Sequence, residues 1–220
     1  MANALVPHVL HVGESHHPWQ APPIERLEVL GDTPDGVRVV PGTLPAVTPR
    51  PGQRVVNRPD HLVVCLPDEA AWVEVQAARA LHQTTLDALA AALRDYGRYD
   101  ERLAASQGGS NPLTPTVVHA WLPPDRYYAP TFFWDGAVPE IVRKRAEAHT
   151  PKRVSSGGVY LMQTHCYLCP DDAAWKHIAG LYQAAVSAAA AWHALRARLG
   201  TYAEARIDGR WSARDTQVRT

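Results

Sequence analysis

The chain has 220 residues, 46% of them hydrophobic, and its 22 basic side chains equal its 22 acidic ones. This balance excludes a global electrostatic field that would draw the protein to nucleic acid or to an anionic membrane. The 3 cysteines are an odd number, which favours a reducing compartment over a disulfide framework. The first residues also lack the basic region of a signal peptide. We therefore expect a protein that is not secreted and that resides in the cytoplasm or in a particle assembled there.

Short apolar segments predict strands ahead of each of two long helical patterns. The dipeptide Asp35-Gly36 supplies the turn chemistry that joins two of these strands in a hairpin. A short helix is expected over Pro139–Ala148, and a last hairpin over Ala203–Ile207 and Trp211–Ala213. The predicted strands are Leu5–Val12, Ile24–Leu30, Val37–Val40, Arg54–Asn57, His61–Leu66, Thr116–Leu122 and Val159–Leu168.

Two long helices start and stop with the same signals. The segments 67–72 and 170–175 both read proline, aspartate, an acid, two alanines and tryptophan, and they lie 103 positions apart. Proline suits the first turn of a helix, and acids favour the positive end of its dipole. Gly97 and Gly200, also 103 positions apart, can take the left-handed conformation that ends a helix. The predicted helices span about 68–96 and 171–199.

The repeat extends upstream, which indicates an internal duplication. Pro7–His11 matches Pro115–His119, here 108 positions apart. We therefore predict an α+β protein whose two long helices pack about a pseudo-two-fold axis, with short antiparallel strands flanking them. The alternative is that two helix starts look alike because they share capping signals. The predicted repeat units are 1–105 and 110–207, with a C-terminal hairpin arm and tail at 208–220; together they could form one compact pseudo-dimeric domain.

Cysteine and histidine residues around the second helix start are the candidate metal ligands. Cys166, Cys169 and His177 could supply three of the four ligands of zinc. In the repeat, however, Cys166 aligns with Val63 and Cys169 with Leu66, and these aliphatic counterparts favour cysteines that pack as core residues. A redox pair is a further alternative, although the acids after the second cysteine would raise a thiol pKa. We predict no cofactor, with zinc as the alternative.

Two histidines form the candidate catalytic site. His11 and His119 occupy equivalent places in the two halves and could meet at the pseudo-axis. A general base also needs an orienting partner and a pocket, and Glu14 is the only nearby acid. The sequence contains no phosphate-binding glycine loop, nucleophile elbow, HExxH pair or EF-hand loop. The prediction leans against an enzyme, and a small metal- or histidine-dependent enzyme is the alternative.

Basic and aromatic residues between the helices are the candidate binding surfaces. The basic segment contains Arg143, Lys144, Arg145, Lys152 and Arg153. Cations beside aromatic rings are the combination that binds single-stranded nucleic acid, and a solvated face beside a packed aromatic corner is the alternative. The aromatic cluster is also the candidate protein interface. Its members are Tyr127, Tyr128, Phe132, Phe133 and Trp134.

The segment His61–Glu69 resembles the strand and helix entry of ribbon–helix–helix repressors. That family dimerises through the strand and reads DNA with it, so the resemblance implies a DNA-binding dimer. It also breaks its helix early, whereas this sequence has no glycine or proline from Asp68 to Tyr96.

These patterns predict a non-catalytic structural or assembly component of a multi-protein complex, such as a virion-like particle, that acts by protein–protein binding. Its partners would be other proteins or copies of itself. The alternative is a nucleic-acid-binding accessory protein that uses the basic segment 143–153. No membrane partner is expected, because the stretch from His177 to Leu195 is rich in alanine, contains Gln183, Ser187 and two histidines, and predicts a buried soluble helix.

Overall fold

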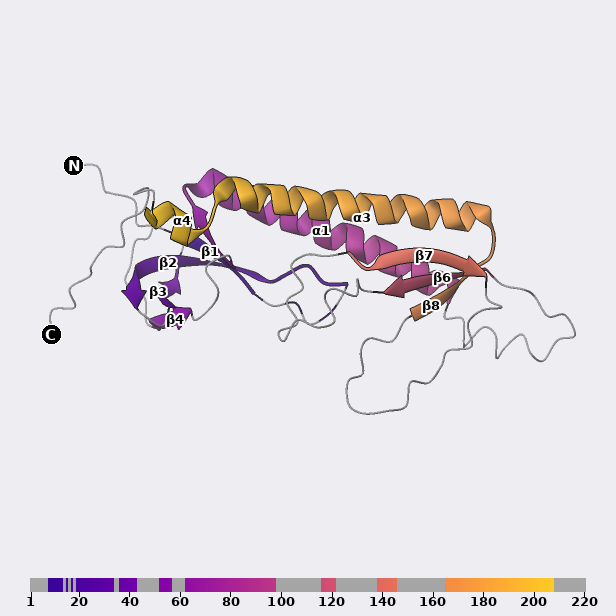
Figure 1. Ribbon diagram of the computed structural model, residues 1–220, viewed down its shortest axis with the longest axis horizontal. Coiled ribbons are helices and arrows are strands. Elements are labelled where there is room, and N and C mark those ends of the chain that lie inside the picture. The colour runs from indigo at the N-terminus through magenta and orange to yellow at the C-terminus, as the bar shows by residue number, and fades with distance from the viewer. Residues whose placement is uncertain are drawn as a thin grey trace, which may run out of the picture. The chain divides into compact units, whose positions relative to one another are not determined.

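The computed structural model describes residues 8–13, 15, 17, 19–33, 36–42, 52–56, 62–97, 116–121, 138–145 and 165–207. The fold is α+β, as predicted, with antiparallel sheets and long helices (Figure 1). The chain divides into two compact units. Unit 1 comprises Met1–Glu14, Pro22–Ala80 and Ala191–Thr220, and unit 2 comprises Ser15–Ala21 and Leu81–Ala190. The boundaries at 105 and 110 were predicted for the sequence repeat. The division into compact units does not test them, so they stay a prediction.

The long helices are α1, Glu69–Tyr96, and α3, Asp172–Leu199, each of 28 residues. Both predicted spans are confirmed to within one residue. Each helix is followed by a glycine, Gly97 or Gly200, whose φ is 74°. This left-handed backbone ends the helix at little cost only where there is no Cβ. α1 begins in unit 1 and ends in unit 2, and α3 does the reverse.

An aspartate caps the first turn of each long helix. Asp68 Oδ1 accepts a hydrogen bond from the Ala71 N–H at 2.8 Å, and Asp171 Oδ1 accepts one from the Ala174 N–H at 2.7 Å. A side-chain oxygen in this place satisfies an N–H that has no partner within the helix. The matching pairs explain why the two helices begin at equivalent residues.

Unit 1 contains a five-stranded antiparallel sheet in the order β4-β3-β2-β1-β5. All five strands were predicted, with small differences at their ends. They are β1 (His8–Val12), β2 (Ile24–Thr33), β3 (Gly36–Pro41), β4 (Arg54–Val56) and β5 (Val63–Leu66).

Apolar side chains cover both faces of this sheet, which explains why every residue of β5 is buried. On one face, Leu10 and Val64 pack with Val75 of α1 and Trp192 of α3. The other face belongs to a second cluster, in which Tyr202 and Ala205 of the short helix α4 (Tyr202–Ile207) pack with β-strand valines. The start of α1 and the end of α3 thus share a core with the same strands.

The helix α4 replaces the strand expected over Ala203–Ile207. Thr201 and Glu204 form a reciprocal cap: the Thr201 N–H donates to Glu204 Oε2 at 2.8 Å, and the Glu204 N–H donates to Thr201 Oγ1 at 3.2 Å. This capping box starts a helix, and the alternating apolar residues could not override it. The other predicted strand, Trp211–Ala213, and the arm and tail at 208–220 lie outside the described residues.

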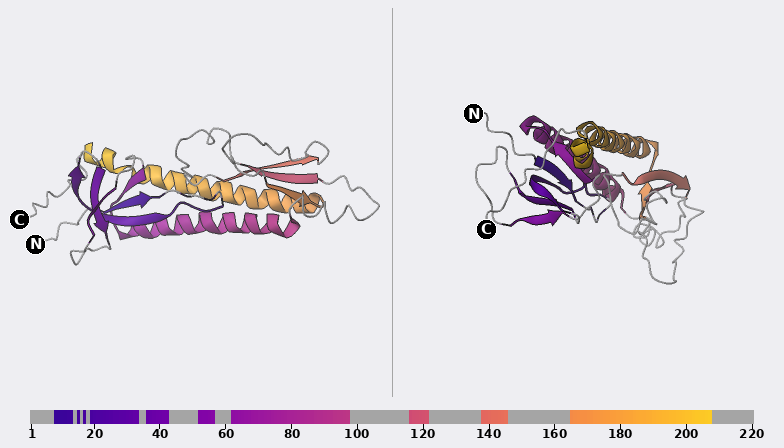
Figure 2. Two further views of the ribbon diagram at one scale, coloured as in Figure 1. Left: turned by 90° about the horizontal axis from the view of Figure 1, so that it is seen from below. Right: turned by 60° about the vertical axis from the view of Figure 1, so that its left-hand side comes forward.

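Unit 2 contains a three-stranded antiparallel sheet in the order β7-β6-β8. One face packs on the adjoining parts of α1 and α3 through a cluster that includes Leu89, Val118 and Ile178 (Figure 2). The strands are β6 (Thr116–Trp121), β7 (Glu140–Arg145) and β8 (His165–Cys169).

The strand β7 corrects the short helix expected over Pro139–Ala148. Ile141 and Val142 are β-branched and therefore favour a strand. Ile141 is buried in the unit 2 core, where it lies opposite Ala120 of β6. Pairing with β6 decided the conformation of a segment that was expected to be a helix.

In each unit, a strand that leads into one long helix bonds to the end of the other long helix. In unit 1 the Cys65 N–H donates to the Gly200 carbonyl at 3.1 Å, and in unit 2 the Leu168 N–H donates to the Gly97 carbonyl at 3.3 Å. β5 precedes α1 but binds the residue after α3, and β8 precedes α3 but binds the residue after α1. Each unit is therefore built from both halves of the sequence.

The resemblance to ribbon–helix–helix repressors does not extend beyond the nine residues that suggested it. α1 continues for 28 residues without an early break. β5 is the last strand of the described five-stranded sheet, and its one strand partner there is β1 of the same chain. In the described ranges, no helix combines the length and apolar character needed to cross a membrane.

Candidate functional site

The strands that lead into the two long helices are paired in the same register. In unit 1, Val9 of β1 lies opposite Cys65 of β5. In unit 2, Val117 of β6 lies opposite Leu168 of β8. The separations that relate these pairs, 108 and 103 positions, are those of the sequence repeat.

The third strand of each set extends this correspondence to a pair of arginines. Leu10 of β1 lies opposite Arg26 of β2, and Val118 of β6 lies opposite Arg143 of β7. Arg26 and Arg143 therefore occupy equivalent places, although the sequence around them differs. Each arginine contacts the start of the helix that follows its sheet.

In unit 1, Arg26 joins β2 to the first turn of α1. Its Nη1 lies 2.8 Å from Glu69 Oε2, and its guanidinium carbon lies 5.0 Å from the centroid of the Trp72 ring. Its Nε also donates to the Gly42 carbonyl at 3.3 Å. The Arg26 side chain is 9% exposed. The cation thus combines an ion pair with a cation–π contact in a place largely removed from water.

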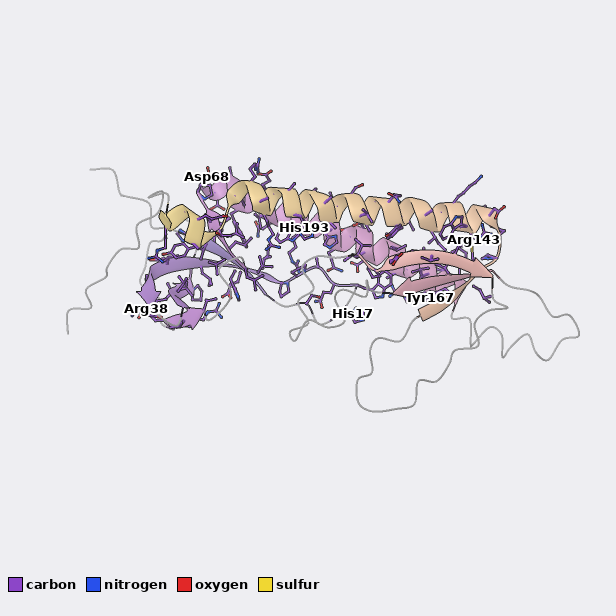
Figure 3. The ribbon with its side chains drawn as sticks, in the orientation of Figure 1. His17, Arg38, Asp68, Arg143, Tyr167 and His193 are labelled. Carbon is purple, nitrogen blue, oxygen red and sulfur yellow. The ribbon has the colours of Figure 1, made fainter. Side chains whose placement is uncertain are left out.

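In unit 2, Arg143 makes the same contacts with α3. Its Nη1 lies 2.7 Å from Asp172 Oδ1, and its guanidinium carbon lies 5.9 Å from the centroid of the Trp175 ring. The Arg143 side chain is 30% exposed. Figure 3 shows Arg143 between β7 and the start of α3. We refer to Arg26, Glu69 and Trp72, and to Arg143, Asp172 and Trp175, as the helix-start clusters.

The helix-start clusters have a structural chemistry: each connects an arginine of a strand to the first turn of a long helix. The acid of each cluster lies in the first helical turn, where it is stabilised by the helix dipole and neutralises the neighbouring arginine. Sequence reasoning missed Arg26 and read Arg143 as a surface cation. An isoleucine two residues before each arginine, Ile24 and Ile141, was the available signal.

The candidate zinc ligands do not form a site within the described residues. Cys169 is buried in the unit 2 core, and His177 is exposed on α3. Burial raises the pKa of the Cys169 thiol; nearby Arg143 opposes this rise, and the charge of Asp171 adds to it. The Cys166 side chain lies outside the description. Among the side chains that are described, no group of histidine, cysteine and acid could hold a metal ion.

The two candidate catalytic histidines lie on equivalent strands. His11 belongs to β1 in unit 1, where it is partly exposed, and His119 belongs to β6 in unit 2. The strand β1 also places His8 in the core, so close to Gly42 that a Cβ at that glycine would lie 2.9 Å from the His8 ring. The His119 side chain lies outside the description, so the shared histidine site stays a prediction.

The basic segment is divided between a strand and residues beyond the description. Arg143, Lys144 and Arg145 belong to β7, whereas Lys152 and Arg153 lie outside the described ranges. Arg143 is the one member of this group whose side chain is described. It forms an ion pair with Asp172 and lies over the Trp175 ring. The aromatic cluster Tyr127, Tyr128, Phe132, Phe133 and Trp134 also lies outside these ranges.

The exposed side of α3 carries no charge over most of its length. Every exposed residue from Gly180 to Ala197 is uncharged, and most are alanine. On α1, Val73 is 57% exposed and Leu81 is 54% exposed. Surface helices usually direct charged residues toward solvent. The exposed residues on α3 are Gly180, Gln183, Ala184, Val186, Ser187, Ala190, Ala191, Ala194 and Ala197.

The strand β7 lies at the edge of the described part of the unit 2 sheet. Its only neighbour among the described strands is β6. The equivalent strand of unit 1, β2, has β1 on one side and β3 on the other. An edge strand presents backbone N–H and C=O groups that can pair with another strand.

Comparison with known proteins identifies no relative: no family model, no curated protein and no solved structure matches the chain.

Proposed function

We propose that this protein is a non-catalytic structural or assembly component that acts by binding other protein chains. The observation that carries the proposal is the uncharged exposed side of α3 between Gly180 and Ala197. At about 1.5 Å per residue, this face extends for about 26 Å. A helix with such a face is stabilised when another apolar surface removes the face from water.

The size of the side chains indicates what kind of surface fits. Alanine, glycine and serine let a neighbouring helix approach to the short end of the usual separation, about 8 Å. Val73 and Leu81 add large exposed apolar groups on α1. The partner surface that suits these features is an apolar helix face rather than a flat polar surface.

The matched registers support a second part of the proposal, that the two sequence halves arose by duplication and follow an approximate two-fold symmetry. Shared capping signals would explain two similar helix starts. They would not explain why the pairing of β1 with β5 and of β6 with β8 follows the separations of the sequence repeat. They would also not explain the equivalent contacts of Arg26 and Arg143.

The proposal can be tested with a photoreactive amino acid at Ser187, an exposed position in the middle of the α3 face. In cells that make this protein naturally, irradiation should give a covalent adduct with a defined protein chain. The variants Ala184→Arg and Ala191→Arg should reduce this adduct at least about tenfold, because a buried unpaired charge costs several kcal/mol. Mass spectrometry of the adduct identifies the partner.

The matched control is Gln76→Arg, which adds the same charge at an exposed position of α1. It should leave the adduct unchanged. An adduct that persists in both α3 variants would contradict binding through this face. A nuclease-sensitive adduct would favour the nucleic-acid-binding alternative.

A further inference from the structure

We propose that α1 carries a peptide-binding site, which this chain occupies with its own segment Ser15–Ala21. The site lies in unit 2, to which this segment and residues 81–96 of α1 both belong. We refer to Ser15–Ala21 as the docked segment; the structure describes its residues 15, 17 and 19–21. The proposal goes beyond the proposed function, because it assigns a second binding site, on α1 rather than on α3.

The side chain of Gln83 holds the docked segment by its backbone. Gln83 Oε1 accepts a hydrogen bond from the Ala21 N–H at 2.8 Å, and Gln83 Nε2 donates one to the Trp19 carbonyl at 3.1 Å. The same Nε2 donates to Asp87 Oδ1 at 2.9 Å, one helical turn further along α1, and this bond fixes which way the amide faces. Main-chain groups are common to all peptides, apart from the N–H that proline lacks. Gln83 can therefore bind the backbone of another chain in the same way.

The side chains of the docked segment indicate which peptides fit. Trp19 packs against the apolar core of unit 2, Gln20 is exposed, and Ala21 is buried. Tryptophan is among the residues that most often anchor one protein chain on another. A fully buried alanine favours a small side chain at the third position, because protein interiors are closely packed. The ligand is therefore a short segment of another protein chain with an aromatic residue, any residue and a small residue in succession.

The docked segment forms a turn with hydrogen bonds of its own. The Gln20 N–H donates to the His17 carbonyl at 3.1 Å, and the Trp19 N–H donates to His17 Nδ1 at 3.2 Å. The Ser15 hydroxyl lies 2.8 Å from the Gln20 carbonyl oxygen, to which it donates. These bonds stay with the segment when it leaves α1, whereas the two bonds to Gln83 break. Local opening of this kind requires less free energy than global unfolding, so a competing peptide can enter the site.

The test uses a fluorescein-labelled peptide with the sequence of residues 15–23 and measures its binding to the full-length chain by fluorescence anisotropy. The wild-type chain should bind it weakly, because the tethered segment competes at an effective concentration on the order of millimolar. Trp19→Ala in the protein removes the anchor of this competitor and should raise the affinity for the peptide at least about tenfold. The same substitution in the peptide should weaken binding at least about tenfold.

Gln83→Ala, added to the Trp19→Ala protein, should weaken peptide binding at least about tenfold, because it removes both main-chain hydrogen bonds. Gln76→Ala is the matched control, since Gln76 is an exposed glutamine of the same helix, and it should leave binding unchanged. Circular dichroism should show that all variants remain folded. A folded Trp19→Ala protein that does not bind the peptide would overturn the inference, as would equal effects of the two glutamine substitutions.

Hydrogen exchange of the wild-type chain tests the release of the docked segment without any substitution. The Ala21 N–H should exchange at least about tenfold faster than the N–H of Leu89, which is buried on α1 in the same unit. Equal rates would show that the segment leaves α1 only when unit 2 unfolds, and this result would contradict the inference.

These outcomes are distinct from those that test the proposed function. Ala184→Arg should leave peptide binding unchanged, and Gln83→Ala should leave the adduct at Ser187 unchanged. Peptide binding that is lost in Ala184→Arg would place the peptide on the α3 face and refute the site on α1. Peptide binding as described, without any adduct at Ser187, would support the α1 site and count against the α3 face.

Discussion

The helix-start cluster of unit 1 is more deeply buried than that of unit 2, although the two have the same parts. Arg26 is 9% exposed and lies 5.0 Å from its tryptophan ring, whereas Arg143 is 30% exposed and lies 5.9 Å from its ring. Arg26 also bonds to the Gly42 carbonyl. The same set of contacts can therefore contribute different amounts to the free energy of unfolding, because solvent weakens the interaction of exposed charges.

The largest expected losses of stability concern equivalent core positions in the two units. Trp192 of unit 1 and Leu89 of unit 2 lie 103 positions apart, and each is among the largest fully buried side chains. Trp192→Ala should lower the free energy of unfolding by about 3–5 kcal/mol and Leu89→Ala by about 2–5 kcal/mol, because each removes buried apolar volume. Urea unfolding followed by circular dichroism measures both. A smaller loss for Trp192→Ala than for Leu89→Ala would contradict the view that the larger buried volume of Trp192 sets the larger loss.

The two arginines give a direct test of the comparison. Arg26→Met should lower the free energy of unfolding by about 2 kcal/mol and Arg143→Met by about 1 kcal/mol, since methionine keeps much of the side-chain volume but removes the cation. The more exposed ion pair of Arg143 is the more strongly screened. Equal losses in urea unfolding at low salt would show that burial does not distinguish the clusters. The difference should widen in 1 M salt, where the Debye length is about 3 Å, because the exposed ion pair of Arg143 is screened more than the buried one of Arg26.

The helix caps provide the case in which no difference is expected. Asp68→Ala and Asp171→Ala should each lower the free energy of unfolding by about 1 kcal/mol, because each leaves one N–H of the first turn without its acceptor. Their hydrogen bonds have nearly the same length, 2.8 and 2.7 Å. Asp68→Asn and Asp171→Asn, which keep an acceptor oxygen, are the matched controls. Unequal losses in the alanine variants would mean that the two helix starts are less alike than their geometry indicates.

The sequence predicted the elements whose signals are local. The caps and the terminal glycines were enough to place α1 and α3, and the dipeptide Asp35-Gly36 was enough to predict the antiparallel pairing of β2 with β3. The errors arose where the deciding interaction is not local. β7 is a strand because it pairs with β6; the β-branched residues Ile141 and Val142 favour a strand but do not identify its partner.

The helix-start clusters were only partly visible in the sequence for the same reason. The tryptophans and acids were found because they lie at a constant separation of 103 positions. Arg26 and Arg143 were not matched, because the loops on either side of their strands differ in length between the halves. Only the pairing of β1 with β2 and of β6 with β7 shows that the two arginines are equivalent.

The way each unit combines both halves of the sequence has a consequence for synthesis on the ribosome. The strands of unit 1 emerge well before Trp192 and Tyr202, which cover their two faces. At about 5–20 residues per second, these strands wait for seconds with an apolar surface open to water. The segment Leu81–Ala190, which completes unit 2, leaves the ribosome in the meantime. We therefore expect the nascent chain to finish its second unit before its first and to depend on chaperones during the interval.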